Sequence, residues 1–233
     1  MERGAVLPDG ADERVTGYGV IGLPFASGHY LALRDFVASS FGPAYRSVWH
    51  RSPAGDWTVY STTPPEQSCP RYLGAALAHP PVTTPIDVTW LGDAHVRVYI
   101  DDILDWTLQL GSTPATRLMT AMSQRMPASA WTNRAALAAM GRMAGTMLSA
   151  GRMRLAGGMP NGQDFFAAPR RIWSIQASSA TLSGRDIGPI GPLAKQDRIG
   201  DFWLPQRGIF FADGTGRFES FDPARHIGAV GAP

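Results

Sequence analysis

Lysine and cysteine are almost absent from this chain of 233 residues, which contains one of each, Lys195 and Cys69. A single cysteine excludes an internal disulfide and gives no support for an oxidising compartment. The remaining basic residues are arginines, and they are scattered singly along the chain rather than gathered in a stripe. With a formal net charge of only +2, no electrostatic argument favours a nucleic-acid partner.

Long apolar runs and metal-binding spacings are also missing. No run approaches the ~20 apolar residues of a membrane-spanning helix, so we expect no membrane span. The first 15 residues are polar and acidic without a signal-peptide core, which predicts a cytoplasmic location. The five histidines form no His-x-x-x-His pattern, and the glycine-rich stretches do not follow a strand and open a helix. We therefore expect neither a metal nor a cofactor.

Apolar residues make up 44% of the chain, with seven tryptophans, enough for a large core in one domain covering residues 1–233. Apolar and polar residues alternate in several segments, as they do in half-buried antiparallel strands. Six proline residues between 64 and 85 predict a long loop. The segments expected to form strands are 29–36, 45–50, 57–61, 86–90, 96–100, 104–110, 152–155, 172–182, 200–204, 208–211 and 217–221.

The periodicity becomes helical at about residues 113–150. Thr113 followed by Pro114 is a helix start, Pro127 ends the first helix, and Ser129 is a cap for the second. Eight of the nine methionines lie between Met119 and Met159. The fold class expected is therefore mainly β or α+β: an antiparallel β-barrel or cone with an inserted, Met-rich helical hairpin.

The methionines support two interpretations. Methionine surfaces adapt to varied apolar ligands, so Met122 and Met140 are candidate ligand-binding residues in a lid over the barrel mouth. Alternatively, methionine and alanine pack the helices onto the sheet, or the Met face docks another chain.

The hairpin at residues 45–61 carries aromatic or titratable groups on both faces, so neither face is plainly solvent-exposed. Trp49 and Tyr60 are candidate ligand contacts. His50 is a candidate general base, and it would form a carboxylate–imidazole pair with Glu66 if the proline-rich loop folds back over the hairpin. The alternative is a structural histidine.

The other candidates lie farther along the chain. Arg97 and Trp106 belong to the segments 96–100 and 104–110, whose polar face is either a barrel mouth or the solvated outside of the sheet. Gln206 and Arg207 precede an apolar strand, and a buried Arg207 would need an acidic partner or an anionic ligand. We expect Cys69 to be buried and inert, because no local histidine accompanies it.

Three segments resemble the acetoacetate decarboxylase-like barrels: Ser68-Cys69-Pro70-Arg71-Tyr72-Leu73-Gly74, Gly188-Pro189-Ile190-Gly191-Pro192-Leu193 and Leu204-Pro205-Gln206-Arg207. The resemblance implies a barrel with a small-molecule cup, in which Tyr72 is a candidate ligand contact. Decarboxylases of that family use a lysine Schiff base. Arg71 cannot replace such a lysine, and Lys195 lies outside the matching segment, so decarboxylation does not follow. Lipocalin-like barrels fit the strand pattern equally well.

These patterns predict a protein that binds an apolar or amphipathic small molecule in a barrel pocket. His50, Glu66 and Arg207 are the candidate catalytic residues for cofactor-independent acid–base chemistry, such as isomerisation, cyclisation, hydration or decarboxylation. The alternative is a non-catalytic ligand-binding or protein-interaction module that uses the Met-rich helical face. A homodimer is the other partner to consider.

Overall fold

The computed structural model describes residues 7–229, so the expectation about the first 15 residues lies partly outside the described part. Three α-helices in this part are α1 (Pro70–Leu73), α2 (Pro114–Arg125) and α3 (Arg134–Met147), with short 3₁₀ turns at Pro65–Gln67, Gly74–Ala76 and Ala128–Thr132. The strands are β1 (Glu13–Pro24), β2 (Tyr30–Ser39), β3 (Tyr45–Arg51), β4 (Trp57–Ser61), β5 (Val82–Thr83), β6 (Asp87–Trp90), β7 (His95–Ile100), β8 (Leu104–Gly111), β9 (Ala156–Gly158), β10 (Asp164–Ala168), β11 (Arg171–Leu182), β12 (Arg185–Asp186), β13 (Arg198–Ile199), β14 (Phe202–Trp203) and β15 (Ile209–Phe218).

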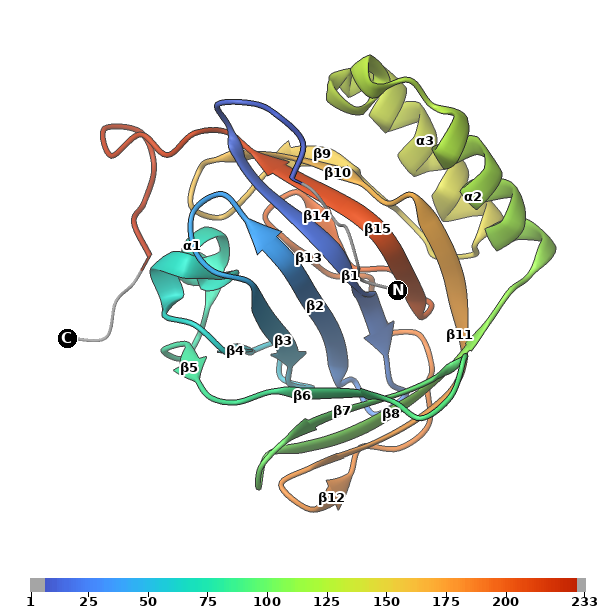
Figure 1. The fold of residues 1–233 in the computed structure, drawn as a ribbon. Helices are drawn as coiled ribbons and strands as arrows, with labels where there is room; N and C mark the ends of the chain where they lie inside the picture. Colours follow the sequence, from blue (N-terminus) through green and yellow to red (C-terminus); the bar gives the residue numbers. More distant parts are fainter. Residues whose placement is uncertain (1–6, 230–233) are drawn as a thin grey trace.

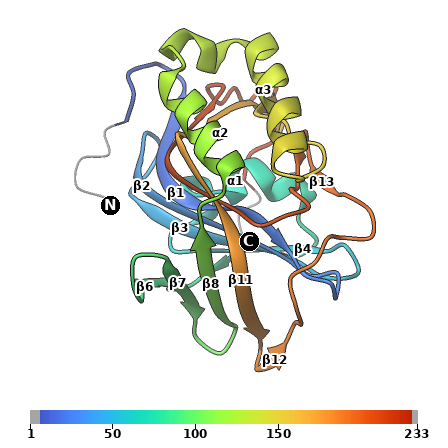
Figure 2. The same cartoon turned by 90° about the vertical axis from the view of Figure 1, so that its right-hand side faces the viewer.

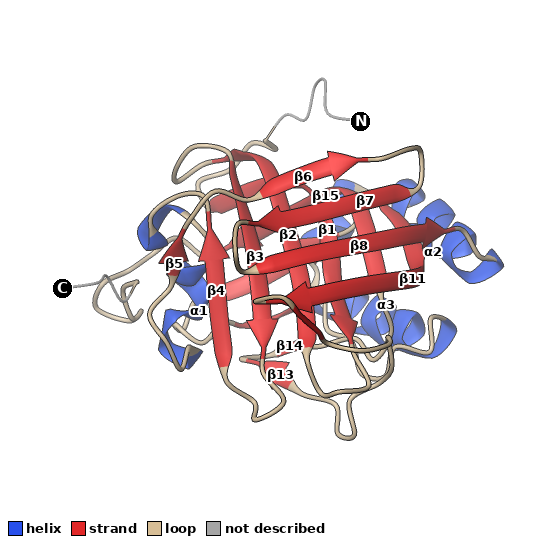
Figure 3. Ribbon diagram, turned by 90° about the horizontal axis from the view of Figure 1, so that it is seen from below, coloured by secondary structure: helices blue, strands red, loops and turns tan. Residues whose placement is uncertain are grey.

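One large sheet curls into a half-barrel (Figure 1), in the order β5-β4-β3-β2-β1-β15-β11-β8-β7-β6, which confirms the expected barrel-like, mainly β fold. Neighbouring strands are antiparallel except β4 and β5, which are parallel. Because the sheet curls, β6, β7, β8 and β11 cross steeply over β1–β4, as Figure 3 shows. The two halves of the sheet thereby enclose one apolar core between them.

Strand β1 was missed by the sequence analysis because it contains Gly17, Gly19 and Gly22 and is buried on both faces, so it shows no alternation. A Cβ added at Gly19 would lie 2.1 Å from the Leu33 carbonyl oxygen. The pairing register of β1 shifts after Val20 on both sides: the next paired residue is Gly22 against β15 and Leu23 against β2. Glycine at these positions lets the bulged strand lie close to β2.

Strands β1–β3 are covered on both faces, so each strand contributes to two cores. In β2, Leu31 and Leu33 face the core inside the half-barrel. Tyr30, Ala32 and Phe36 face a second core on the other side of the sheet, because successive side chains of a strand point to opposite faces. The second core is closed by α1, β10 and the segment leading into β15.

The helical hairpin packs on β11 near one end of the molecule (Figure 2). Thr113 and Pro114 start α2 as expected, with a capping box between Thr113 and Thr116. The second helix starts later than expected: Ser129 lies in a 3₁₀ turn, and the side chain of Asn133 caps α3. No helix within residues 7–229 is long and apolar enough to cross a bilayer.

The expected strand at 152–155 is irregular chain, and β9 forms at Ala156–Gly158 instead. Its pairing explains the shift, because β9 lies alongside β10, with Asp164 opposite Gly158. Local propensity does not determine which residues such a short strand pairs with.

Candidate functional site

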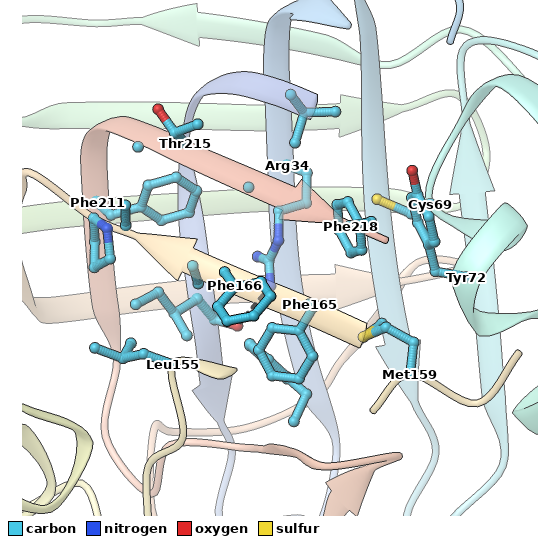
Figure 4. A pocket seen from close by; sticks show the side chains of 18 of the residues that line it. Arg34, Cys69, Tyr72, Leu155, Met159, Phe165, Phe166, Phe211, Thr215 and Phe218 are labelled. Atoms are coloured by element: carbon cyan, nitrogen blue, oxygen red, sulfur yellow. Dashed lines mark hydrogen bonds between the residues drawn. The ribbon is translucent and has the colours of Figure 1, made fainter. Parts of the chain in front are cut away.

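A cavity of about 110 Å³ lies in the second core, between the outer face of β1–β3 and β15 and the layer formed by α1, β10 and β14. Its walls are almost wholly apolar and aromatic, and Figure 4 shows Phe165, Phe166, Phe211 and Phe218 around it. The lining also includes Arg34, Tyr45, Trp49, Cys69, Tyr72, Met153, Arg154, Met159, Phe202, Trp203 and Thr215.

Arg34 is the buried charged residue of this lining; Arg154, the other arginine, is exposed and pairs with Asp201. Arg34 follows Tyr30 and Ala32 on the outer face of β2 and is only 6% exposed. Its Nη1 donates to the carbonyls of Val20 and Leu33, and its Nη2 donates to that of Ile21 at 3.4 Å. Ile21 has no ladder partner on either side of the bulged strand β1. The guanidinium therefore donates a hydrogen bond to a backbone carbonyl that the bulge leaves without one.

The guanidinium still has unused donors and no acidic partner. Of its five N–H groups, the one on Nε and one on Nη2 donate to no described residue. The neighbouring Asp35 points to the other face, where it accepts from Arg46 at 2.9 Å and Tyr18 at 2.8 Å. No aspartate or glutamate is among the described residues that line the cavity.

Aromatic rings partly compensate the buried charge. The Arg34 guanidinium carbon lies 4.3 Å from the centre of the Trp49 ring and 5.8 Å from that of Phe211, within cation–π range. Figure 4 shows the side chain extending toward Phe166. Burial lowers the pKa of Arg34 from its usual value, which is the expected effect of removing a cation from water without a counter-ion.

The cysteine and the two tyrosines of the cavity favour their neutral forms. Burial raises the pKa of the Cys69 thiol, although the Arg34 charge opposes that shift. Burial also raises the pKa of Tyr45 and Tyr72 well above the usual value. The Trp49 Nε1–H, on a side chain 5% exposed, makes no hydrogen bond of normal geometry with a described residue, but it faces Cys69 closely enough to oppose the rise in the pKa of that thiol. The cavity therefore offers hydrogen-bond donors and a positive charge but no general base for neutral pH.

A polar cluster beside the cavity fixes one wall. Glu13 accepts two hydrogen bonds from Arg71, at 3.0 and 2.7 Å, and one from the Tyr72 hydroxyl at 2.8 Å. Burial on its own would raise the pKa of Glu13, but hydrogen bonds from Arg71, Tyr72 and Gln163 outweigh it and leave that pKa lowered. The Tyr72 ring stacks on Phe218 with centroids 3.8 Å apart.

Two of the predicted ligand contacts, Trp49 and Tyr72, line this cavity. Tyr60 packs against the core inside the half-barrel instead. Arg34 was not among the candidates. The signal for it was an arginine in a strand whose other residues on the same face, Tyr30, Ala32 and Phe36, are all large or apolar.

His50 and Glu66 are not brought together. His50 Nε2 lies 2.9 Å from Nδ1 of His29, with the two rings stacked. Burial, and secondarily the neighbouring His29, lowers the pKa of His50 to about 4. Glu66 is exposed in the first 3₁₀ turn, where its backbone carbonyl accepts from Arg71. This placement matches the alternative interpretation of His50 as a structural histidine.

The remaining candidates are spread over the fold. Arg97 pairs with Asp105 at 2.8 Å on the outer face of β7 and β8, and Trp106 is fully buried in the barrel core. Met140 lies on the buried face of α3, whereas Met122 is 36% exposed. Gln206 and Arg207 line a separate groove that shares no lining residue with the cavity.

The methionine lid is absent from the cavity. The two methionines that line it, Met153 and Met159, follow the helical hairpin rather than belong to it. Within residues 7–229, no cluster of three or more histidine, cysteine, aspartate or glutamate side chains is arranged to hold a metal ion.

Comparison with known proteins finds similarity to solved structures alone. No family model and no curated protein matches the chain. The chain is similar to acetoacetate decarboxylase from Legionella pneumophila subsp. pneumophila str. Philadelphia 1, with 10% identity, a TM-score of 0.42, and coverage of 96% of this chain and 90% of that one. A second acetoacetate decarboxylase structure matches at 9% identity and a TM-score of 0.42, over 96% of this chain and 92% of the other. These matches agree with the resemblance noted in the sequence.

Proposed function

We propose that the protein binds a small apolar carboxylic acid in this cavity, with the carboxylate on Arg34 and the hydrocarbon part among the phenylalanine rings. The observation that carries the proposal is a buried guanidinium with two free donors and no acidic partner in an aromatic cavity. A buried cation is costly unless it is paired, and a planar carboxylate is the natural partner of a guanidinium.

The size of the cavity limits the ligand. A cavity of roughly 150 Å³ holds one benzene molecule, so about 110 Å³ encloses a group slightly smaller than benzene. Pentanoate has one non-hydrogen atom more than benzene, so the end of its chain would reach the side of the cavity that is not sealed. Longer chains would have to extend past Met153 and Trp203 at the cavity wall. A bulky fatty acid or sterol acid is therefore a poorer fit than a short-chain acid.

Binding is favoured over catalysis by the protonation states of the lining groups. Cys69, Tyr45 and Tyr72 are held neutral by burial, which raises the pKa of each. None of them is a general base near neutral pH, and the His29–His50 pair lines no part of the cavity. The interaction-module alternative keeps one observation in its favour, the exposed Leu118 and Met122 on α2.

Calorimetric titration with pentanoate and with pentanamide tests the proposal, because the amide has the same shape without the charge. We expect pentanoate to bind at least about tenfold more tightly, since a hydrogen bond to a charged group contributes about 1.5–3 kcal/mol. Equal binding of acid and amide would contradict the role of Arg34. So would failure of the folded protein to bind pentanoate.

Variants separate binding from folding. Arg34→Lys keeps the buried charge but loses the planar pair of donors, and should weaken pentanoate at least about tenfold. Trp49→Phe keeps an aromatic ring and removes the indole N–H, and should weaken it by about three- to tenfold. Arg97→Lys, at an arginine on the outer face of the sheet, is the matched control and should bind as the wild type does.

A further inference from the structure

A second, larger groove lies between the helical hairpin and the end of the half-barrel, with a volume of about 690 Å³. Its walls come from the end of β1, the first turn of α2, the C-terminal end of α3 with the residues after it, residues 173–176 of β11, and the segments at 190–192 and 206–209. Trp173, Met147 and Ile190 supply apolar wall. This volume falls within the range of pockets that hold drug-sized ligands.

The polar lining of the groove has one sign of charge. Arg207 is exposed and forms no hydrogen bond or ion pair with any described residue. No aspartate or glutamate is among the described residues of the lining, whose other polar members are neutral, such as Ser149, Ser174 and Gln176. A positive charge beside an apolar wall, with no acid near it, complements an amphipathic anion.

The backbone that carries Arg207 is rigid. The Gln206 side chain accepts from the Leu193 amide at 2.8 Å and donates to the Leu193 carbonyl at 3.4 Å. The Gln206 amide donates to the Ala150 carbonyl, and the Gly208 carbonyl accepts from Ile175. Gly208 is also packed so closely that an added Cβ would lie 2.5 Å from Leu23. These contacts fix the backbone of Arg207 at the groove, which lowers the entropy that this segment loses on binding.

We propose that this groove is a second ligand site, for a bulky aromatic or polycyclic molecule with one anionic group. The anionic group lies on Arg207 and the rings lie against Trp173. The proposal does not depend on the short-chain acid assigned to the cavity, because the two sites share no lining residue.

Anilinonaphthalene sulfonate is a suitable probe, and phenylnaphthylamine, which lacks the sulfonate, is its neutral control. We expect the sulfonate probe to bind and Arg207→Gln to weaken it by about three- to fivefold, as for a charge-assisted contact at an exposed arginine. Phenylnaphthylamine binding should be unchanged by that substitution. Arg185→Gln, at an exposed arginine outside the groove, is the matched control.

The binding site is located by nuclear magnetic resonance of the seven tryptophan indole N–H groups, with Trp173 identified by Trp173→Phe. We expect the sulfonate probe to shift the Trp173 signal and pentanoate to shift that of Trp49. The proposal is overturned if the folded protein does not bind the probe, if Arg207→Gln leaves its affinity unchanged, or if the probe shifts Trp49 and not Trp173. Loss of pentanoate binding with probe binding intact would refute the cavity proposal alone.

Discussion

The His29–His50 pair makes the stability of the fold sensitive to mild acid. Burial lowers the pKa of His50 from 6.5 to about 4, so the folded state favours the neutral ring while the unfolded chain takes up a proton near pH 6.5. The stabilisation from His50 is therefore complete above pH 6.5 and is lost as the pH falls toward 4. Below that pH both states are protonated and His50 adds no further change.

The pKa gap of His50 corresponds to roughly 3 kcal/mol in total, of which about 2 kcal/mol is lost between pH 7 and pH 5. Burial also lowers the pKa of His29, which adds to the loss in the same direction. His50→Gln keeps a hydrogen-bonding side chain but cannot titrate. The variant should therefore lose about 2 kcal/mol less than the wild type over this interval.

Urea unfolding at pH 7, 6 and 5 measures the free energies of unfolding. His79→Gln, which removes an exposed histidine, is the control for the loss of a histidine in itself. If wild type and His50→Gln lose stability in parallel between pH 7 and pH 5, the argument that burial holds His50 neutral is refuted.

Three further substitutions test the packing and polar contacts. Glu13→Gln removes the charge that pairs with Arg71 and should lower the free energy of unfolding by about 2–4 kcal/mol, measured by urea unfolding. Gly19→Ala places a methyl group against the Leu33 carbonyl and should cost about 3 kcal/mol or more, or prevent folding. Met140→Ala should cost about 2–4 kcal/mol, because Met140 lies on the buried face of α3, and a thermal melt shows the loss.

Each substitution has an exposed counterpart. Asp105→Asn breaks the solvent-facing pair with Arg97, Gly92→Ala adds a methyl group that meets nothing within 4 Å, and Met122→Ala truncates a partly exposed methionine. If an exposed substitution lowers the free energy of unfolding as much as the buried substitution it is matched with, the stabilising role given to the buried residue is contradicted.

The sequence predicts the part of the fold that depends on simple alternation. Strands β6–β8 have one buried and one solvated face, so their residues alternate visibly. Strand β1 could not be found in this way, because both of its faces are buried. Its glycines are also required by the close approach of the β2 backbone, which the sequence does not show. The start of α3 was misplaced because the 3₁₀ turn before it contains an equally good cap residue, Ser129.

The candidate site was predictable only in part. Trp49 and Tyr72 are aromatic residues in segments that were singled out, and they line the cavity. Arg34 lies in a strand whose inner face carries Leu31 and Leu33. Its own face is buried only because the layer of β10 and β14 covers it. That layer is built from residues more than 100 positions away along the chain. His50 and Arg207 were identified as polar residues of interest, but the fold places each outside the cavity.

A crystal structure of the protein with bound pentanoate tests the central claim most directly. The account predicts the carboxylate within hydrogen-bond distance of Arg34 Nε or Nη2, with the alkyl chain among Phe165, Phe166 and Phe211. An empty cavity at saturating pentanoate, or pentanoate bound at Arg207 instead, would contradict it.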